Sequence, residues 1–587
     1  MGCGTRSTRA CSATREGGFL KLMGSMNRRA FVGRIVALSV VPLLQACAPA
    51  APAAPTAGPA TKPTEAPKPA ATTAAPAPTA VAKAPTTAPA PTTAPTTAPA
   101  VKPTVPAGQP VSGGVLRSTL GAEPTSVDPH KINTLFDRDV ADAMFDALID
   151  DDTLDGIKGA LAESWDSPDA RVWTFKLRAG VKFHDGSPLT ADVVKASYDR
   201  LQDPNTGITG GIRPTASQVD SVEAVDASTV KITLKTPSAA FPVDASNIKI
   251  IPKNFDEAKP IGTGPFQFVE WIRNQRVRLK KNPEYFVKGQ PYLDELVFLP
   301  TPDENQKIVL LQTGQVDFSD TIPLPRVKEI SAGGKIVVYP IPVGVSPSSY
   351  FMPLKTDKAP LDNAKVRQAM NLAIDRKALL DVTFGVGTIK SNVVPPKHWA
   401  FNPNAMSYDN RDVARAKQLM AEGGHPNGFS LQFKFITSRA EYTPMAQLFQ
   451  ANLADIGVKL ELLPKELGVW VDEVLNKHDF ELGMTGIIPD YDPHAIMVRY
   501  HSKDSQDGQS MNWQNPEFEQ LLAQGKVTVN QEERKKIYFR AQELAQEGAP
   551  GFVVNERPIL YGATPQVQGF RPDIRQHTHF ASVWMTK

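Results

Sequence analysis

The chain has 587 residues, which exceeds what one hydrophobic core usually supports, and 41% of them are apolar. The formal net charge is +3, but residues 1–47 carry +6 and residues 48–110 carry +3, so the rest carries about −6. Nucleic-acid-binding proteins present clustered basic surface. Because the excess basic charge lies in the first 110 residues, the main body gives no sign of a nucleic-acid partner, and we expect none.

Residues 1–47 have the pattern of an export signal. Arg28 and Arg29 precede an apolar run over residues 35–44, which is shorter than the roughly 20 residues of a membrane-spanning helix. The arginine pair leaves both twin-arginine and general export open. The run ends in Leu-Gln-Ala-Cys47, similar to the lipobox of bacterial lipoproteins, and no cysteine follows it. We therefore predict that Cys47 is lipidated and becomes the first mature residue.

Residues 48–112 form a predicted disordered tether. They are almost entirely Ala, Pro and Thr and contain no aromatic residue. Such a segment cannot bury enough apolar surface to offset the entropy of ordering, so it stays solvated and semi-extended.

Short strands dominate the next part of the chain. Apolar and polar residues alternate over residues 172–178, as in a half-buried strand. Residues 221–234 indicate a hairpin that turns near residues 226–228. A tight turn at residues 262–266 leads into strands over 266–271 and 276–280.

The later part alternates strands and helices. Asp362 is expected to cap a helix over residues 363–384. Strands are predicted at 430–436, 458–463 and 480–488, with helices at 442–456 and 469–476 between them. This succession implies parallel strands with right-handed crossovers, and ligands bind beyond the carboxyl ends of such strands. Pro489 ends the third strand, which places residues 490–494 at a candidate ligand site.

Five segments in chain order resemble the family 5 extracellular solute-binding proteins, which are the dipeptide, oligopeptide and nickel binders of ABC importers. The resemblance runs from about residue 113 to residue 571. The segments that carry it are Leu-Ala-Glu-Ser-Trp at 161–165, Thr-Phe-Lys-Leu-Arg-Ala-Gly-Val-Lys-Phe-His-Asp-Gly-Ser-Pro-Leu-Thr at 174–190, Gly-Thr-Gly-Pro-Phe at 262–266, Leu-Asp-Asn-Ala-Lys-Val-Arg-Gln-Ala-Met-Asn-Leu-Ala-Ile-Asp at 361–375 and Asn-Leu-Ala-Asp-Ile-Gly-Val at 452–458.

The resemblance implies an α/β fold of the two-lobed periplasmic-binding-protein type, class II, with an extra small subdomain and a hinge-bending cleft. Lobe 1 would comprise residues 113–344, including the small subdomain at about 156–247. Lobe 2 would comprise residues 345–547, and residues 548–587 would return to lobe 1.

The resemblance also implies a ligand contact. In peptide-binding members, an Asp in a segment like W-x-A-D-Y-x-D/E-P pairs with the α-amino group of the ligand. Asp490-Tyr491-Asp492-Pro493 resembles this segment, so Asp490 is the matching carboxylate. A buried ammonium needs an opposite charge to offset its desolvation. The segment departs from the pattern, since Ile487 stands for the Trp and one residue is missing after Tyr491, which leaves the solute open.

Other residues near this segment are candidates for contact or for structure. Tyr491, Trp470 and Trp513 could stack on a sugar or a peptide side chain, although such residues more often belong to the core. Asp492 and His494 are expected to shape the loop.

Metal and catalytic sites are not expected. Asp490, Asp492 and His494 could share one side of an extended chain, but Pro493 breaks that geometry. His577 and His579 are a second pair, which we expect on the surface. No hydrolase, zinc-protease or phosphate-loop motif occurs. We therefore predict no metal ligands, no cofactor and no enzymatic activity.

The sequence thus predicts a monomeric, membrane-anchored lipoprotein on the extracytoplasmic face of the cell membrane or in the periplasm. It would capture peptides and deliver them to permease subunits that work with a cytoplasmic ATPase. Oligosaccharides, nickel or another small polar solute are alternative cargoes, and an exported hydrolase is the alternative from another class.

Overall fold

The computed structural model describes residues 108–150, 156–208, 212–342, 344–346, 348–487, 491–500, 503 and 505–586. All of them belong to one compact unit, Ala94–Lys587. The predicted export signal with Cys47, most of the tether and Asp490 lie outside these ranges. No helix within the ranges combines the length and apolar character that crossing a membrane requires.

Lobe 1 is built on a seven-stranded mixed sheet. β1 pairs in parallel with β10 and β11, and the other pairings are antiparallel. Helices α1 (Leu135–Met144), α5 (Glu304–Gln312) and α6 (Val327–Ala332) accompany the sheet, with short 3-10 turn η2 (Leu324–Arg326). The strands in sheet order are β12 (Val337–Pro340), β18 (Leu560–Ala563), β11 (Phe318–Ser319), β1 (Val115–Leu120), β10 (Glu295–Pro300), β9 (Arg276–Lys281) and β8 (Phe266–Ile272).

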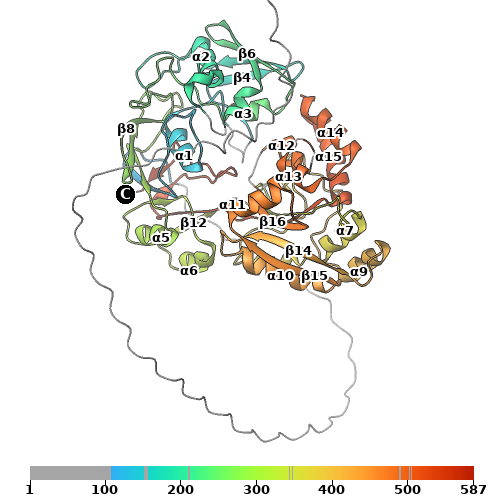
Figure 1. Cartoon of the computed structure of the whole chain (residues 1–587). Helices are drawn as coiled ribbons and strands as arrows, with labels where there is room; N and C mark the ends of the chain where they lie inside the picture. Colours follow the sequence, from blue (N-terminus) through green and yellow to red (C-terminus); the bar gives the residue numbers. More distant parts are fainter. Residues whose placement is uncertain are drawn as a thin grey trace, which may run out of the picture. The chain divides into compact units, whose positions relative to one another are not determined.

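The small subdomain has its own sheet and its own core, and Figure 1 shows its elements grouped together in teal and green. The predicted hairpin is confirmed as β6 and β7, which turn at residues 227–228. The elements are strands β2 (Ile149–Asp150), β3 (Lys158–Gly159), β4 (Ala162–Asp166), β5 (Val172–Leu177), β6 (Val219–Asp226) and β7 (Thr229–Leu234), helices α2 (Ala191–Gln202), α3 (Ile212–Ser217) and α4 (Phe241–Ala245), and turn η1 (Pro204–Thr206).

Lobe 2 contains the predicted parallel strands. β14 (Phe429–Ile436) pairs in parallel with β15 (Val458–Lys465) on one side and with β16 (Leu482–Ile487) on the other, so the predicted succession is confirmed. β13 (Ser349–Pro353) and β17 (Gly551–Glu556) complete the five-stranded sheet in antiparallel pairings.

The helices of lobe 2 pack on this sheet or beside it (Figure 1). They are α7 (Ala364–Ala373), α8 (Arg376–Val382), α9 (Val413–Glu422), α10 (Tyr442–Ala454), α11 (Leu467–Trp470), π-helical turn η3 (Val471–Asn476), α12 (Pro493–Met497), turn η4 (Val498–Tyr500), α13 (Gln506–Met511), α14 (Pro516–Val527) and α15 (Gln531–Gly548). A last hairpin, β19 (Val567–Gln568) and β20 (Trp584–Met585), follows in the C-terminal segment.

One predicted helix is wrong in its extent. The segment 363–384 forms two helices, because Ile374 turns to an extended conformation and Asp375 caps α8 by accepting a hydrogen bond from Ala378 N at 2.9 Å. The first helix is capped by Asn363, which accepts from Lys365 N, and not by Asp362.

The second chain crossing between the lobes falls later than the sequence indicates. The sequence places the return to lobe 1 near residue 548, whereas β17 is fully buried and pairs with β13 in the lobe 2 sheet. The chain therefore crosses after Glu556 and enters the lobe 1 sheet as β18. The C-terminal segment then fills the lobe 1 core with Phe570, Phe580 and Val583.

Glu556 ties the two crossing segments together at the hinge. Its carboxylate is only 5% exposed and accepts hydrogen bonds from Gly344 N and Ser346 N, both at 3.2 Å. Lys390, which is 2% exposed, donates from Nζ to Ser346 O at 3.1 Å. Burial lowers the pKa of the Lys390 ammonium to about 8, although the charge of Glu556 opposes this change.

Replacing Glu556 with Gln should destabilise the fold. A Gln amide presents N–H groups to one of the two backbone donors, so one charge-assisted bond is lost and a buried donor is left without an acceptor. We expect the free energy of unfolding in urea to fall by about 2 kcal/mol. The exposed Glu532→Gln is the matched control, with an expected change within about 0.5 kcal/mol. Equal effects of the two changes would contradict the role of Glu556.

The buried ammonium of Lys390 predicts a pH dependence of stability. Between about pH 8 and 10 the unfolded chain keeps this proton while the folded protein releases it, so the free energy of unfolding should rise with pH. The full effect is roughly 3 kcal/mol. Urea unfolding between pH 7.5 and 9.5 should show the rise in the parent protein and in the control Lys335→Met, but not in Lys390→Met. A rise of the same size in Lys390→Met would refute this assignment.

Candidate functional site

A cavity of about 420 Å³ lies between lobe 1, lobe 2 and the hinge. Its lobe 1 wall includes Asp139 of α1, Lys307 of α5 and Asp320. Its lobe 2 wall is the loop of residues 438–441, and its hinge wall is residues 557–560. We refer to this cavity as the inter-lobe cleft.

The lobe 2 wall of the cleft lies where an open α/β sheet binds ligands. Residues 438–441 follow β14 directly and lead into α10, so they sit at the carboxyl end of a parallel strand. Arg439 in this loop is exposed, and Glu441 is 4% exposed. The hydroxyl of Tyr350 donates to Glu441 Oε1 at 3.3 Å, which holds that carboxylate in place.

A second guanidinium reaches the cleft from the hinge. Arg557 follows Glu556, its Nε donates to Ser348 Oγ at 3.2 Å, and the side chain is half-buried. The guanidinium lies against β16 at Gly486, where a Cβ would meet Arg557 Nη1 at 2.8 Å and the Tyr442 hydroxyl at 3.0 Å. The glycine is needed at this position so that Arg557 can lie close to the strand.

Neither Arg439 nor Arg557 forms an ion pair with a described residue, although the carboxylate of Glu441 lines the same cavity. Within the part of the chain that the structure describes, no carboxylate lies within 4.0 Å of either guanidinium. Other arginines of the protein, both buried and exposed, form ion pairs, for example Arg534 with Asp492 and Arg540 with Glu517. Two unpaired guanidiniums that line one cavity can accept an anionic group of a ligand.

The lobe 1 wall largely neutralises itself. Lys307 Nζ lies 2.6 Å from Asp320 Oδ1, and both side chains are buried. Asp139 accepts hydrogen bonds from Thr578 N and Oγ1, but burial and the nearby charge of Asp320 raise the pKa of its carboxyl well above the ordinary value. This favours the neutral acid. Apart from these residues, the cleft presents two carboxylates, Glu304 and Glu441, and the two guanidiniums.

A second cavity, of about 400 Å³, lies between the small subdomain and lobe 2. Tyr491 lines it, and its carbonyl oxygen lies 2.7 Å from His398 Nε2, which donates to it. Asp492 caps α12 through His494 N and forms a buried, two-pronged ion pair with Arg534 at 2.9 and 3.0 Å. The predicted loop-shaping role of Asp492 is therefore confirmed.

The predicted ligand contacts fall into three groups. Asp490 lies outside the described residues, so its contact with a solute stays a prediction. Tyr491 lines the second cavity and is absent from the lining of the inter-lobe cleft, so its contact with a solute stays a prediction. Trp470 and Trp513 instead lie in two cores of lobe 2 at 1% and 7% exposure.

The two tryptophans are structural residues in this conformation. Trp470 covers β14 and donates from Nε1 to Lys434 O at 3.0 Å. Trp513 packs on Phe518 with ring centroids 5.0 Å apart and lies close over Gly548. Their predicted contact with a ligand is therefore corrected to core packing, which large aromatic side chains favour.

The expectation that both C-terminal histidines lie on the surface is wrong for His577. Its side chain is only 5% exposed. Arg138 Nη1 donates to its Nε2 at 2.8 Å, and Asp142 faces its other nitrogen. The His579 side chain is 37% exposed.

We did not predict from the sequence that Arg439 and Arg557 line the cleft. The rule that selected residues 490–494 also applies to the end of the strand predicted at 430–436, where Ser-Arg-Ala-Glu follows at residues 438–441. Arg439 could have been found in this way. No local signal identifies Arg557, since its place in the cleft depends on the chain crossing after Glu556.

Known proteins similar to this chain agree with the two-lobed fold. Residues 156–509 match the family described as bacterial extracellular solute-binding proteins, family 5 Middle. A glutathione-binding protein, GsiB, from Pectobacterium atrosepticum is 29% identical over 475 residues, which span 77% of this chain and 90% of the relative.

Two solved structures are similar along their whole length. HbpA2 from Haemophilus parasuis has a TM-score of 0.73 and 27% identity, with 81% of this chain and 100% of that chain covered. The periplasmic binding protein DppA from Helicobacter pylori, solved in complex with the peptide STSA, has a TM-score of 0.63 and 26% identity, with 81% and 99% covered.

Proposed function

Because the chain belongs to family 5 of the bacterial extracellular solute-binding proteins, we propose that it captures short peptides with free carboxylates for an ABC importer. Members of such a family bind and carry a solute without changing it chemically. Glutathione, the tripeptide named for the Pectobacterium relative, has two carboxylates and one ammonium and is a representative cargo.

The observation that carries this proposal is the pair of guanidiniums, Arg439 and Arg557, at the inter-lobe cleft. A carboxylate placed between them would form charge-assisted hydrogen bonds, and an arginine can bind it with two parallel N–H groups. An uncharged sugar would leave both guanidiniums without a counter-charge. The cleft therefore favours an anionic or zwitterionic solute.

Asp490 is our candidate for the opposite end of the peptide. In the sequence it comes three residues after the end of β16, which is the parallel neighbour of β14. Ligands bind beyond the carboxyl ends of such strands. The carboxylate that follows β16 would pair with the ammonium of a zwitterion, and the guanidinium that follows β14 would pair with its carboxylate.

Closure of the lobes about the hinge would bury the bound peptide, and the ligand would shift the balance between open and closed forms. The closed protein would then deliver the peptide to permease subunits in the membrane, which work with a cytoplasmic ATPase. We expect the binding protein to act as a monomer.

The carboxylate contact is testable with matched ligands. Calorimetry should show that Arg439→Gln weakens binding of glutathione and of free tripeptides by about 10- to 100-fold, since hydrogen bonds to charged groups contribute about 1.5–3 kcal/mol. A C-terminally amidated tripeptide should bind the parent protein more weakly and lose less affinity on the substitution. Asp490→Asn with free and N-acetylated peptides tests the ammonium contact in the same way.

Several outcomes would contradict the peptide proposal. Binding of oligosaccharides or Ni²⁺ in place of peptides would identify another cargo. Unchanged peptide affinity in both Arg439→Gln and Asp490→Asn would show that the cleft does not hold the charged ends. Native mass spectrometry of the purified protein can identify a co-purified ligand independently.

We also propose that the protein is a lipoprotein held to the membrane through Cys47 and the tether. The support is the Leu-Gln-Ala-Cys pattern after an apolar run, followed by a long Ala/Pro/Thr segment. The binding unit would then stand clear of the membrane on a semi-extended spacer.

Lipidation can be tested by metabolic labelling with a fatty-acid analogue. Label should be incorporated into the parent protein and into Cys11→Ser, whereas Cys47→Ser should lose the label and leave the membrane fraction. Persistent labelling of Cys47→Ser would refute the anchor.

A further inference from the structure

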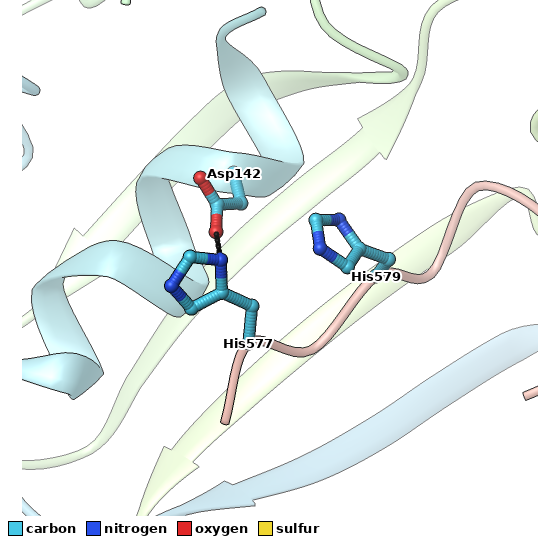
Figure 2. A group of neighbouring side chains, drawn as sticks. All are labelled: Asp142, His577 and His579. Atoms are coloured by element: carbon cyan, nitrogen blue, oxygen red, sulfur yellow. Dashed lines mark ion pairs between the residues drawn. The ribbon is translucent and has the colours of Figure 1, made fainter. Parts of the chain in front are cut away.

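Asp142, His577 and His579 meet in lobe 1, and none of them lines the inter-lobe cleft. Asp142 comes from α1, and both histidines come from the C-terminal segment beside it (Figure 2). His577 Nδ1 lies 3.5 Å from Asp142 Oδ2, and one ligand atom from each residue lies within 4.8 Å of the others. The buried Oδ2 accepts no hydrogen bond from any residue that the structure describes, which is unusual for a buried carboxylate oxygen.

We propose that these three side chains bind a divalent transition-metal ion of the zinc type. Two imidazole nitrogens and one carboxylate oxygen are a common set for Zn²⁺, and a water molecule supplies the fourth position. In a tetrahedral site with bonds of about 2.0–2.1 Å, the ligand atoms lie roughly 3.3 Å apart. The partly exposed His579 is the ligand that has to move inward, since Asp142 and His577 are buried and already close.

Solvent reaches the site through a cavity of about 620 Å³. Asp142 and His579 line this cavity, together with Asp146, Lys249 and Asp573. It shares no lining residue with the inter-lobe cleft. An ion could therefore enter and bind without contact to a solute in the cleft.

Two neighbouring cations determine how the ion binds. Lys249 Nζ lies 2.7 Å from Asp142 Oδ1, so Oδ2 is the oxygen left for the metal. Arg138 donates to His577 Nε2, which places the ring proton of the neutral imidazole on Nδ1. For Nδ1 to bind the metal, its proton has to move to Nε2. Arg138, which is only half-buried, then has to turn away from that nitrogen. Arg138 thus weakens the site.

The test is a calorimetric titration of the full chain with Zn²⁺, without a histidine tag. Cys3, Cys11 and Cys47 are replaced by serine so that thiolates cannot bind the ion. We expect one Zn²⁺ per chain. His579→Ala should weaken binding by at least about tenfold, because even outer partners of a metal site change affinity by roughly 10–100-fold. Arg138→Met should tighten it. Co²⁺ in place of Zn²⁺ should give the visible absorption of a four-coordinate site, and His579→Ala should lose it.

We choose His579 for substitution because it is partly exposed, so the variant is expected to fold. Thermal unfolding without metal checks this. His425→Ala, a histidine of lobe 2, is the matched control and should bind like the parent. No Zn²⁺ binding by the parent, or equal affinity in His579→Ala and the parent, would overturn the proposal. Peptide affinity measured with a chelator present should be unchanged in His579→Ala, which separates this site from the cleft.

Discussion

The carboxylate of Glu556 joins the two segments that connect the lobes, and the geometry of the cleft depends on it. It accepts from the backbone of Gly344 and Ser346 in the first crossing and itself ends the strand that begins the second. Arg557, the next residue, extends into the cleft. The hinge and the solute-binding surface are thus adjacent along the backbone. A hinge motion that rotates this short segment also moves a guanidinium that lines the cleft, so closure and ligand contact are mechanically linked.

The two sides of the cleft differ in how their basic residues are paired. Lobe 1 presents Lys307 already paired with Asp320, and it buries Asp139 so deeply that the pKa of the carboxyl is raised. Lobe 2 and the hinge present Arg439 and Arg557, which form no ion pair with any residue that the structure describes, although Glu441 lines the same cleft. A ligand anion gains more from such unpaired groups than from a pair that it would have to separate, since breaking a buried ion pair leaves a charge exposed to a poorly polarisable interior.

The C-terminal segment has two roles that depend on its return to lobe 1. Its apolar residues complete the lobe 1 core, and its polar residues bind α1 through Thr578 with Asp139 and through His577 with Arg138. Both of these polar residues are buried against α1, which precedes them in the chain by several hundred residues. The same packing brings a pair of histidines next to Asp142 (Figure 2). Asp142 and His579 line a cavity that shares no lining residue with the cleft.

The sequence by itself determined the features that depend on local patterns. The parallel strands β14, β15 and β16 follow from apolar runs with helices between them, and the subdomain hairpin follows from alternation around a turn. Their order also predicted a ligand site at residues 490–494, of which Tyr491 and Asp492 line the cavity between the small subdomain and lobe 2. The sequence could not separate a core tryptophan from a stacking one, because Trp470 has the same neighbours in either case. It could not place Arg557 in the cleft or bury His577. Those positions were decided only by tertiary structure, since each depends on contacts between segments that lie far apart in the chain.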